Sequence, residues 1–348
     1  MGKLQIVVGG QAGSEAKGHV AAQLAVADRN PHGVSAVRVA GPNAGHSAVA
    51  PDGTKWALRC IPVAAVVNPH AALYLAAGSE IDIAVLHDET TRLEAAGIPI
   101  RSRLLIDRMA TILEPRHHAA EASSGIVGRI GSTGKGIGAA RADRIARTAL
   151  TVRDTDLADA YNIGDVAPQL RTDLAHGAVC QLEGTQGHWL GLHHEFYPQV
   201  TSSDCRALDF AAMAGVSPWA REVTDLEVWV VFRTRPIRVA GNSGPLPGET
   251  TWDALGLPEE RTTVTQKVRR VGAWDGELAR RAVEDNGGPG GPVRIALTMA
   301  DQLSPSLSGS TDPVDLTEQV EDFIAQVESD TGGRVHLVGT SDRTVIWL

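Results

Sequence analysis

The stretch VVGGQAGSEAKGH, residues 7–19, is the part around which the rest of this 348-residue chain is organised. Apolar side chains at positions 4 and 6–8 predict a buried first strand, and the glycines at 9, 10 and 13 then open a loop. The loop leads into a helix that we expect to begin near Lys17. Backbone N–H groups at a helix N-terminus favour an anion, and Lys17 adds a full positive charge. The stretch therefore predicts a phosphate site, and the alternative is a turn that uses glycine for backbone reasons alone.

The same stretch departs from the P-loop pattern G-x-x-x-x-G-K-[ST]. Lys17 is preceded by Ala16, where the pattern has glycine, and followed by Gly18, where the pattern has a hydroxyl. The hydroxyl that binds magnesium in a P-loop is therefore missing at this position.

The composition excludes several classes of protein. A net charge of −9 argues against a general nucleic-acid binder, so a phosphate site must be local. Three widely spaced cysteines, none in a C-x-x-C pair, indicate neither a disulfide framework nor a zinc site. The N-terminus has no signal pattern, and no apolar run approaches the roughly 20 residues of a membrane span. We expect a soluble cytoplasmic protein that binds neither nucleic acid nor a membrane.

Apolar runs alternate with helix-like stretches along the chain. The runs lie at 4–8, 34–39, 73–76, 104–106, 179–182, 226–232, 293–297 and 335–338, and the helix-like stretches include 80–96, 275–285 and 316–327. This alternation predicts an α/β fold with a mainly parallel central sheet flanked by helices. The Gly- and Pro-rich stretches 241–256 and 286–292 predict loops, one of them long enough to be a lid or an insertion. Because the sequence has no clear domain boundary, we expect a single domain over residues 1–348.

Five further stretches carry unusual polar chemistry. They are AGPNAGHS at 40–47, RIGSTGKGIGAARADRIAR at 129–147, LEGTQGHWLGLHHEFYPQVTSS at 182–203, TTVTQKVRRVGAW at 262–274 and TMAD at 298–301. The first places a histidine just after a strand, where open α/β sheets bind ligands. The second is another glycine-rich loop that could hold phosphate, followed by a helix with arginines at 141, 144 and 147 along one side. The alternatives are a structural histidine and a solvated basic helix face.

In this order, the stretches resemble the motifs of the adenylosuccinate synthetase family as far as Asp301. That family has G-D-E-G-K-G-K, N-A-G-H-T, G-T-T-G-[RK]-G-I-G-P, E-G-[AT]-Q-G, Y-P-x-V-T-S-S, T-x-R-x-R-R and T-K-x-D. This chain has GSEAKGH, NAGHS, GSTGKGIGA, EGTQG, YPQVTSS, TQKVRRVG and TMAD. The resemblance implies a P-loop-NTPase-like α/β fold with loop and small subdomain insertions. It also implies a ligase that joins L-aspartate to C6 of a purine nucleotide through a 6-phosphoryl intermediate.

Two departures fall on positions that read the substrates. Ser14 stands where the family has its catalytic aspartate, and Met299 stands where its base-reading motif has lysine. This pattern is similar to the bacteriophage branch that makes the precursor of 2-aminoadenine, base Z. The resemblance then implies dGMP as acceptor, ATP or dATP as phosphate donor, Mg²⁺ as metal and N6-succino-2-amino-2′-deoxyadenylate as product. The alternatives are an ordinary adenylosuccinate synthetase, which uses IMP and GTP, and a catalytically inactive purine-nucleotide-binding protein.

The resemblance also implies roles for individual residues. The implied catalytic residues, with His46 as general acid, are Ser14, Lys17, His46 and Gln186. The purine nucleotide would be bound by Ser14, Asn43, Ala44, Ser132, Thr133, Arg147, Gln186 and Thr201. The triphosphate would be bound by Gly13, Glu15, Ala16, Lys17, Gly18, Gly45, His46, Ser47, Arg269 and Asp301. Aspartate would be bound by Thr263, Val264, Thr265, Lys267 and Arg269, and magnesium by Ser14 and the Gly45 carbonyl.

A serine is a poor base, so the residues leave open how the reaction loses its proton. Either Ser14 works through a water molecule, or Glu15 or the substrate phosphate takes the proton. The resemblance further implies a homodimer in which Arg147 reaches the nucleotide phosphate in the partner's site.

Overall fold

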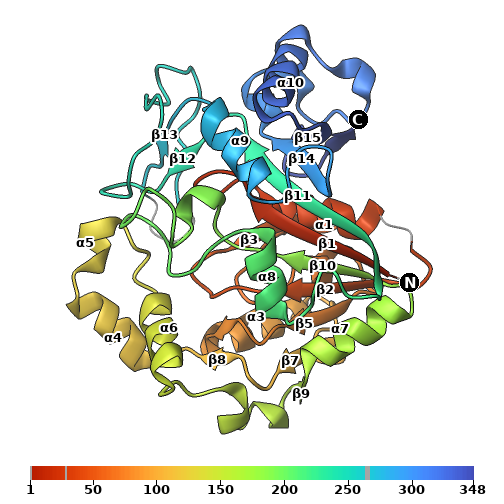
Figure 1. Cartoon of the computed structure of the whole chain (residues 1–348), viewed down its shortest axis with the longest axis vertical. Helices are drawn as coiled ribbons and strands as arrows, with labels where there is room; N and C mark the ends of the chain where they lie inside the picture. The colour runs from red at the N-terminus through yellow and green to blue at the C-terminus, as the bar shows by residue number, and fades with distance from the viewer. Residues whose placement is uncertain (1, 28–29, 263–266) are drawn as a thin grey trace.

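The central sheet confirms the α/β class. The structure, a computed structural model, describes residues 2–27, 30–262 and 267–348 (Figure 1). Ten strands form one sheet in the order β16-β15-β14-β11-β1-β10-β2-β5-β7-β9, and every neighbouring pair is parallel except β15–β16. They are β1 (Gly2–Gly9), β2 (Val34–Arg38), β5 (Ala72–Leu75), β7 (Leu104–Asp107), β9 (Asn162–Gly164), β10 (Val179–Glu183), β11 (Val223–Arg233), β14 (Val293–Thr298), β15 (Val335–Gly339) and β16 (Val345–Trp347).

The eight apolar runs predicted as strands all lie in this sheet. Strand β1 is central, between β10 and β11, and its apolar side chains Leu4, Ile6, Val7 and Val8 are fully buried. A strand covered on both faces is apolar without interruption, which is why these runs are easy to recognise. The edge strand β9 has no such run, and β16 is a short apolar stretch near residue 348; neither was among the strands predicted from the sequence.

The helices cover the sheet, and they include the three predicted stretches. The predicted helix at 80–96 begins only at Ile83, because Asp82 caps it by accepting hydrogen bonds from the amides of Ala84 and Val85. The helices are α1 (Lys17–Ala27), α2 (Ala64–Val67), α3 (Ile83–Ala95), α4 (Pro115–Ser123), α5 (Ile126–Ile130), α6 (Ile137–Ala146), α7 (Val166–Ala175), α8 (Ala207–Ala214), α9 (Gly276–Glu284) and α10 (Glu318–Thr331). Short 3₁₀ turns lie at 152–154, 157–159, 188–190, 300–302, 305–307 and 313–315.

Three small strand pairs lie outside the central sheet. They are β3 (His46–Val49) with β4 (Lys55–Leu58), β6 (Glu80–Ile81) with β8 (Thr111–Ile112), and β12 (Ile237–Arg238) with β13 (Arg270–Val271). The hairpin β3–β4 carries His46 as its first residue, and both predicted Gly- and Pro-rich stretches are loops.

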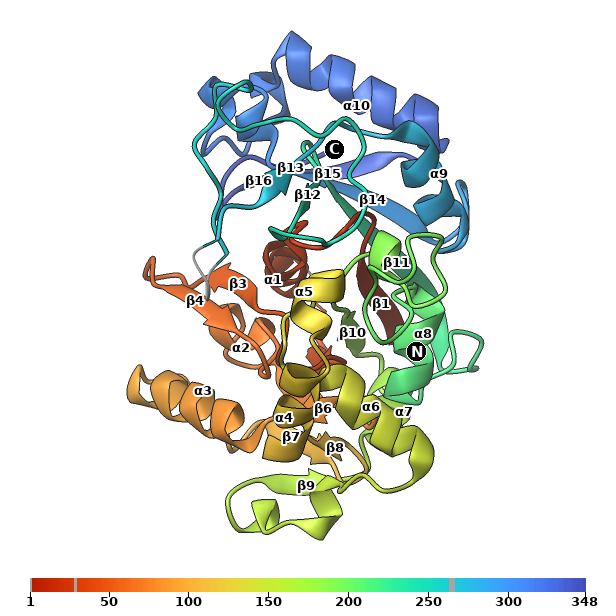
Figure 2. The ribbon, with the colours of Figure 1, turned by 90° about the vertical axis from the view of Figure 1, so that its left-hand side faces the viewer.

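The parallel strands end at one edge of the sheet, and the conspicuous motifs follow those ends. Strands β1, β2, β10, β11 and β14 terminate there at Gly9, Arg38, Glu183, Arg233 and Thr298. Helix α10 lies at the top of both views, and helices α4 and α6 lie in the lower half (Figures 1 and 2). None of the helices in the described ranges combines the length and apolar character needed to cross a membrane.

Candidate active site

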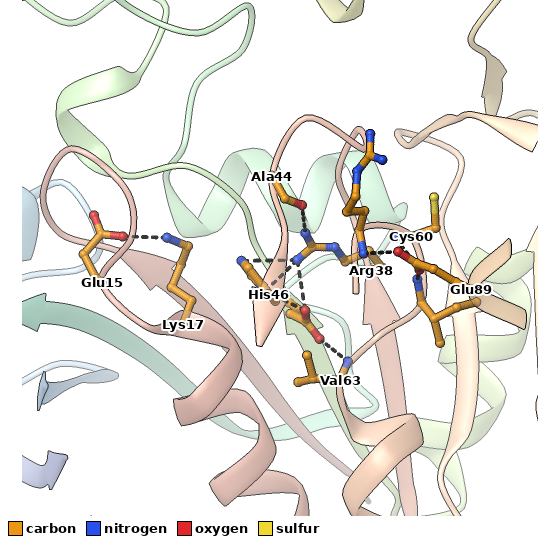
Figure 3. Close-up of polar contacts among 11 residues, drawn as sticks. Glu15, Lys17, Arg38, Ala44, His46, Cys60, Val63 and Glu89 are labelled. Carbon is orange, nitrogen blue, oxygen red and sulfur yellow. Dashed lines mark hydrogen bonds and ion pairs between the residues drawn. The ribbon is translucent and has the colours of Figure 1, made fainter. Parts of the chain in front are cut away.

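The glycine loop after β1 closes on one of its own carboxylates. Glu15 is fully buried, and its Oε1 accepts hydrogen bonds from the amides of Gln11 at 3.1 Å and Gly13 at 2.8 Å. The Nζ of Lys17 lies 2.6 Å from Oε2 of the same carboxylate (Figure 3). In this structure Glu15 satisfies the amides of Gln11 and Gly13, and the binding of a triphosphate by Gly13 stays a prediction. The Lys17 side chain, which pairs with Glu15, carries the positive charge of the loop.

The EGTQG segment after β10 packs directly on this loop. A Cβ on Gly187 would lie 2.3 Å from the Gln11 carbonyl oxygen and 2.4 Å from Oε1 of Glu15, and a Cβ on Gly9 would lie 2.6 Å from the Gln186 carbonyl oxygen. Side chains at positions 9 and 187 would thus separate the two segments. The glycines bring Gln186 and Glu15 together, as the sequence analysis expects of one site.

A second buried cluster surrounds His46. The Nδ1 of His46 lies 2.6 Å from Oε1 of Glu183, and Nη1 of Arg38 lies 2.9 Å from the same oxygen (Figure 3). The other oxygen, Oε2, accepts the amide of Val63 at 2.9 Å. Because Arg38 and a protonated Nδ1 are both donors, their 2.7 Å approach is a contact rather than a hydrogen bond. Glu183 therefore fixes the Nδ1–H tautomer, and Nε2 of His46, which lies 3.4 Å from Nη1 of Arg38, is the ring nitrogen left to meet a ligand.

The charges of this cluster determine the protonation of His46. Burial and the neighbouring Arg38 lower the pKa of His46 to about 4, so the imidazole is neutral near pH 7. Burial alone would raise the pKa of Glu183, but Arg38 and His46 hold it below its ordinary value. The buried charges are thus Glu183 and Arg38, with a neutral histidine between them. The sequence analysis does not identify Arg38 or Glu183, although each is a charged residue at the end of a buried strand.

Left-handed backbone conformations gather at the predicted site positions. The non-glycine residues with positive φ are Ser14 (59°), Ala16 (62°), Arg147 (65°), Gln186 (60°) and Met299 (61°) within the described ranges. Each such residue costs about 1–2 kcal/mol, and such strain concentrates at functional sites. Four of the five lie in loops that follow β1, β10 and β14 at one edge of the sheet.

The TMAD segment after β14 is anchored to the glycine loop. The Thr298 hydroxyl lies 3.0 Å from the Glu15 carbonyl oxygen and 3.1 Å from that of Phe232. The hydroxyl of Thr234 holds the Met299 carbonyl at 2.9 Å. Asp301 is partly buried, and burial raises the pKa of its carboxyl group. The predicted base-reading motif and the predicted phosphate loop are therefore neighbours.

A buried arginine that the sequence analysis misses lies beneath Ser14. Arg233, the last residue of β11, is completely buried, and its Nη1 lies 3.4 Å from the Ser14 carbonyl oxygen. Arg233 and Arg269 both pair with the carboxylate of Glu260. Arg269 was predicted as a ligand of the triphosphate and of aspartate, and in this structure its partner is Glu260. An arginine at the end of a buried central strand is the signal that could have identified Arg233.

The second glycine-rich loop is also capped by a carboxylate of the chain. Glu121 accepts the amides of Gly136 at 2.8 Å and Gly138 at 2.9 Å, at the start of α6. The expectation that the glycines of this loop hold phosphate is wrong for these two amides, because Glu121 occupies them. The hydroxyls of Ser132 and Thr133 remain, with Ser132 Oγ accepting only the amide of Gly134 at 3.2 Å among the described residues.

The predicted row of three arginines on one helix side is also incorrect. Helix α6 ends at Ala146, and Arg147 caps it in a left-handed conformation. Arg141 pairs with the buried Glu80 at 2.7 Å instead of facing solvent. Arg147 is exposed, and its Nη1 donates to the Ile145 carbonyl oxygen at 2.6 Å, so within one chain it does not contact the other predicted site residues that the structure describes.

The remaining predicted residues lie in segments that adjoin these clusters. The Ala44 carbonyl accepts Nη2 of Arg38 at 3.1 Å, between the partly buried Asn43 and the exposed Gly45 and Ser47. The amide of Thr201 donates to the Leu190 carbonyl at 2.8 Å, which ties Thr201 to the segment that follows Gln186. Lys267 is described and exposed, whereas Thr263, Val264 and Thr265 lie outside the described residues.

The described residues contain no group of three or more His, Cys, Asp or Glu side chains that could hold a metal. The predicted magnesium ligands, Ser14 and the Gly45 carbonyl, supply only neutral oxygens. Magnesium commonly binds through substrate phosphates with few protein ligands, and this donor set fits that kind of binding. The three cysteines are free and buried.

The sequence is similar to known proteins over nearly its whole length. A family model described as adenylosuccinate synthetase matches residues 6–162 and 156–307. Adenylosuccinate synthetases of Thermococcus sibiricus and Methanococcus vannielii are 38% and 37% identical over 339 residues, covering 96% of this chain and 95% of each relative.

Two solved structures resemble this one. The succinoaminodeoxyadenylate synthetase (PurZ) of cyanophage S-2L, bound to dGMP and dATP as an energy donor, is 28% identical. Its TM-score is 0.81, and the match covers 99% of this chain and 94% of that one. The fully ligated adenylosuccinate synthetase of Plasmodium falciparum is 19% identical with a TM-score of 0.84 over 100% of both chains, which is a likeness of fold.

Proposed function

Because this chain belongs to the adenylosuccinate synthetase family, and is therefore a C–N ligase that joins aspartate to a purine nucleotide, we propose that its acceptor is dGMP. The proposed products are N6-succino-2-amino-2′-deoxyadenylate, ADP or dADP, and phosphate. The observation that carries this proposal is Ser14, which replaces the family's catalytic aspartate. The cyanophage protein of similar fold binds dGMP, which agrees with this acceptor.

The size of residue 14 distinguishes the two acceptors. By the resemblance, residue 14 approaches N1 of the purine, and guanine differs from hypoxanthine by an amino group on the neighbouring carbon. Serine is shorter than aspartate, so it leaves room for that amino group, and its hydroxyl can accept one hydrogen bond from it. The preference for the deoxy sugar rests on the resemblance alone.

A second candidate, the IMP-using adenylosuccinate synthetase, is favoured by the degree of identity. The archaeal synthetases are 37–38% identical to this chain, whereas the cyanophage protein is 28% identical. Identity over the whole chain reflects mainly the scaffold, whereas residue 14 lies where the two acceptors differ. The two candidates therefore differ in acceptor and donor and share the reaction.

The donor proposal, ATP or dATP, rests on the TMAD segment. Met299 retains apolar packing along a base but lacks the charge of the lysine found in the family. The Asp301 carboxylate can accept a hydrogen bond from an exocyclic amine, including that of adenine. We therefore expect ATP or dATP to serve at least as well as GTP.

In the proposed reaction, the triphosphate phosphorylates the purine 6-oxygen, and the aspartate amine then displaces that phosphate from C6. Lys17 leaves Glu15 for the transferring phosphate, and His46, protonated once the triphosphate has raised its pKa, donates a hydrogen bond from Nε2 to it. Gln186 meets the purine near its 6-oxygen. Mg²⁺, held mainly by phosphates with help from the Gly45 carbonyl and Ser14, would neutralise phosphate charge.

The remaining contacts follow the family. Asn43, Ala44, Ser132, Thr133 and Thr201 hold the phosphate and sugar of the purine nucleotide. Thr263, Val264, Thr265, Lys267 and Arg269 bind the carboxylates of aspartate. In a homodimer, Arg147 reaches the nucleotide in the partner subunit's site. This assignment explains why an arginine in a left-handed conformation lies exposed beyond the end of α6.

The contacts of Glu15 argue against this residue as the missing base. The Glu15 carboxylate is occupied by Lys17 and two amides, and it is fully buried, so it is badly placed to take a proton from a substrate. We therefore assign proton removal to a water molecule bound by Ser14 or to the substrate phosphate.

Steady-state kinetics of the wild-type protein test the proposal. Phosphate release is measured with aspartate, Mg²⁺, and dGMP, GMP or IMP as acceptor, in the presence of ATP, dATP or GTP. We expect the highest kcat/KM with dGMP and an adenine donor, and mass spectrometry identifies the succinyl product. A higher kcat/KM for IMP contradicts the dGMP assignment, and a strong GTP preference contradicts the donor assignment.

A further inference from the structure

The side chain of Glu260 is bound by three residues from three different parts of the chain. Its Oε2 lies 3.2 Å from Nη1 of Arg233 and 3.3 Å from Nη1 of Arg269, and its Oε1 accepts Nε2 of Gln302 at 2.8 Å. Nη2 of Arg233 also pairs with Oε1. Two guanidinium groups and an amide around one carboxylate are the donor set with which proteins bind carboxylate ligands.

This group of residues lies inside the proposed site. Nη1 of Arg233 is within 3.4 Å of the Ser14 carbonyl oxygen as well as within reach of Glu260. Glu260 and Arg269 face each other across two antiparallel segments, where the Arg269 amide donates to the Glu260 carbonyl at 2.8 Å. Arg261 follows Glu260 and Val268 precedes Arg269, and these two residues form an antiparallel bridge. In sequence they flank the residues that are proposed to bind aspartate. The carboxylate of Glu260 therefore occupies donors beside the amino-acid site.

The hydrogen bonding of this group is incomplete. Nε of Arg233, Nε of Arg269 and Oε1 of Gln302 are buried without a hydrogen-bond partner among the described residues. Buried networks that serve only the fold normally satisfy their members, because an unsatisfied buried polar group destabilises the folded state. Three unsatisfied atoms around one carboxylate indicate donors and an acceptor arranged for a larger ligand than Glu260.

We propose that Glu260 is a built-in stand-in for a carboxylate of the aspartate substrate, bound to Arg233 and Arg269 while the site is empty and displaced when aspartate binds. This inference rests on the proposed function, because it takes aspartate as the ligand. It adds Arg233 to the residues that bind the amino acid. Glu260 keeps the arginines in a ligand-binding arrangement, and it also competes with the ligand. The apparent affinity for aspartate is then reduced by the fraction of molecules in which Glu260 is bound.

Two substitutions and one matched control test the proposal. Glu260→Gln keeps the shape of the side chain and removes its charge. Gln302→Leu removes one donor that binds Glu260. The control is Glu259→Gln, since Glu259 is the neighbouring residue, lies on the surface and pairs with Arg261 instead. The KM for aspartate, kcat, the KM for both nucleotides and the melting temperature are measured for each protein with whichever purine nucleotide the wild type uses best.

We expect Glu260→Gln to lower the KM for aspartate by about three- to thirtyfold, with kcat and both nucleotide KM values unchanged. Gln302→Leu removes a donor that both carboxylates would use, so it should change the same KM much less than Glu260→Gln does, and Glu259→Gln should match the wild type. If the melting temperature falls while the KM for aspartate stays the same or rises, the group is a structural ion pair and the proposal is overturned. If the wild type releases no phosphate in response to aspartate with any purine nucleotide, the proposed function fails and this inference fails with it.

Discussion

Gly18 lies directly against His46. A Cβ on Gly18 would be 2.6 Å from the Cβ of His46 and 3.0 Å from the amide nitrogen of Ser47. Gly18 is the second residue of α1, and His46 is the first residue of β3. The absence of a side chain at position 18 therefore lets the N-terminus of α1, with Lys17, touch the strand that carries His46. Two motifs that are far apart in sequence become one site through this contact.

Replacing Gly18 by alanine should damage catalysis more than stability. The added methyl group must push β3 away from α1, and overpacking of this kind costs about 1–3 kcal/mol. A displacement of His46 by 1 Å can lower turnover by about a hundredfold. The measurements are kcat and the melting temperature of Gly18→Ala. The control is Gly128→Ala in α5, where a Cβ meets no atom within 4 Å. Full activity in Gly18→Ala would show that the contact does not position His46.

Replacing His46 by asparagine should separate binding from chemistry. We expect turnover to fall by about two or more powers of ten, the usual range for general acid–base catalysis, while nucleotide dissociation constants change little. His70→Asn, an exposed histidine outside the site, is the control. Calorimetry measures binding, and phosphate release measures turnover. An unchanged turnover would reduce His46 to a structural role.

Triphosphate binding should raise the pKa of His46. Without ligand, burial and Arg38 lower this pKa to about 4 from its ordinary value of 6.5. The folded protein thus binds this proton less readily than the unfolded chain, so His46 contributes a loss of stability as pH falls from 6.5 toward 4. The negative charge of a triphosphate favours imidazolium, so binding should take up a proton. NMR titration of the imidazole nitrogens, assigned with His46→Asn, measures the shift. An unchanged pKa would exclude His46 as an acid in its cationic form.

Much of the fold can be predicted from the sequence because the central strands are buried on both faces. Runs such as Leu4–Val8 have no other stable environment in a protein of this kind. The edge strand β9 and the hairpin that carries His46 have mixed sequences, and their pairing depends on contacts that are distant in sequence. These elements could not be located from periodicity.

The sequence motifs lie near one another in the structure, but their charge balance differs from what the sequence suggests. The glycine loops and the motifs after the strands do meet at one edge, because parallel strands end together. The amides at Gln11, Gly13, Gly136 and Gly138 are nevertheless taken by Glu15 and Glu121. A sequence pattern indicates which amides could bind an anion. Only the tertiary structure shows that a carboxylate of the same chain already binds them.

Arg147 should act across a dimer interface. It is exposed next to Ile145, whose side chain is 72% exposed, and an apolar side chain so exposed is consistent with a surface covered by a partner. We expect a dimer in analytical ultracentrifugation at micromolar concentration. Arg147→Ala and His46→Asn should each be nearly inactive, and mixing them should restore part of the activity, because a mixed dimer contains one site with both residues. A fully active monomer, or mixed proteins that stay inactive, would show that Arg147 does not complete the partner's site.

Replacing Ser14 by aspartate should shift the acceptor preference from dGMP toward IMP. Ser14 has φ 59°, a conformation that aspartate tolerates better than most residues, so the change is confined to the side chain. The longer carboxylate takes the space that we assign to the 2-amino group of guanine.

Hydrogen bonding alone does not force this outcome, since a carboxylate could accept from both N1–H and the amino group, and Ser14→Ala therefore serves as the comparison. Ser14→Ala keeps the space and removes the acceptor, so it should retain the preference for dGMP in weakened form. For Ser14→Asp, we expect the ratio of kcat/KM for dGMP to that for IMP to fall about tenfold or more, equivalent to about 1.4 kcal/mol. A wild type that prefers IMP, or a ratio that Ser14→Asp leaves unchanged, would remove Ser14 as the residue that selects the acceptor.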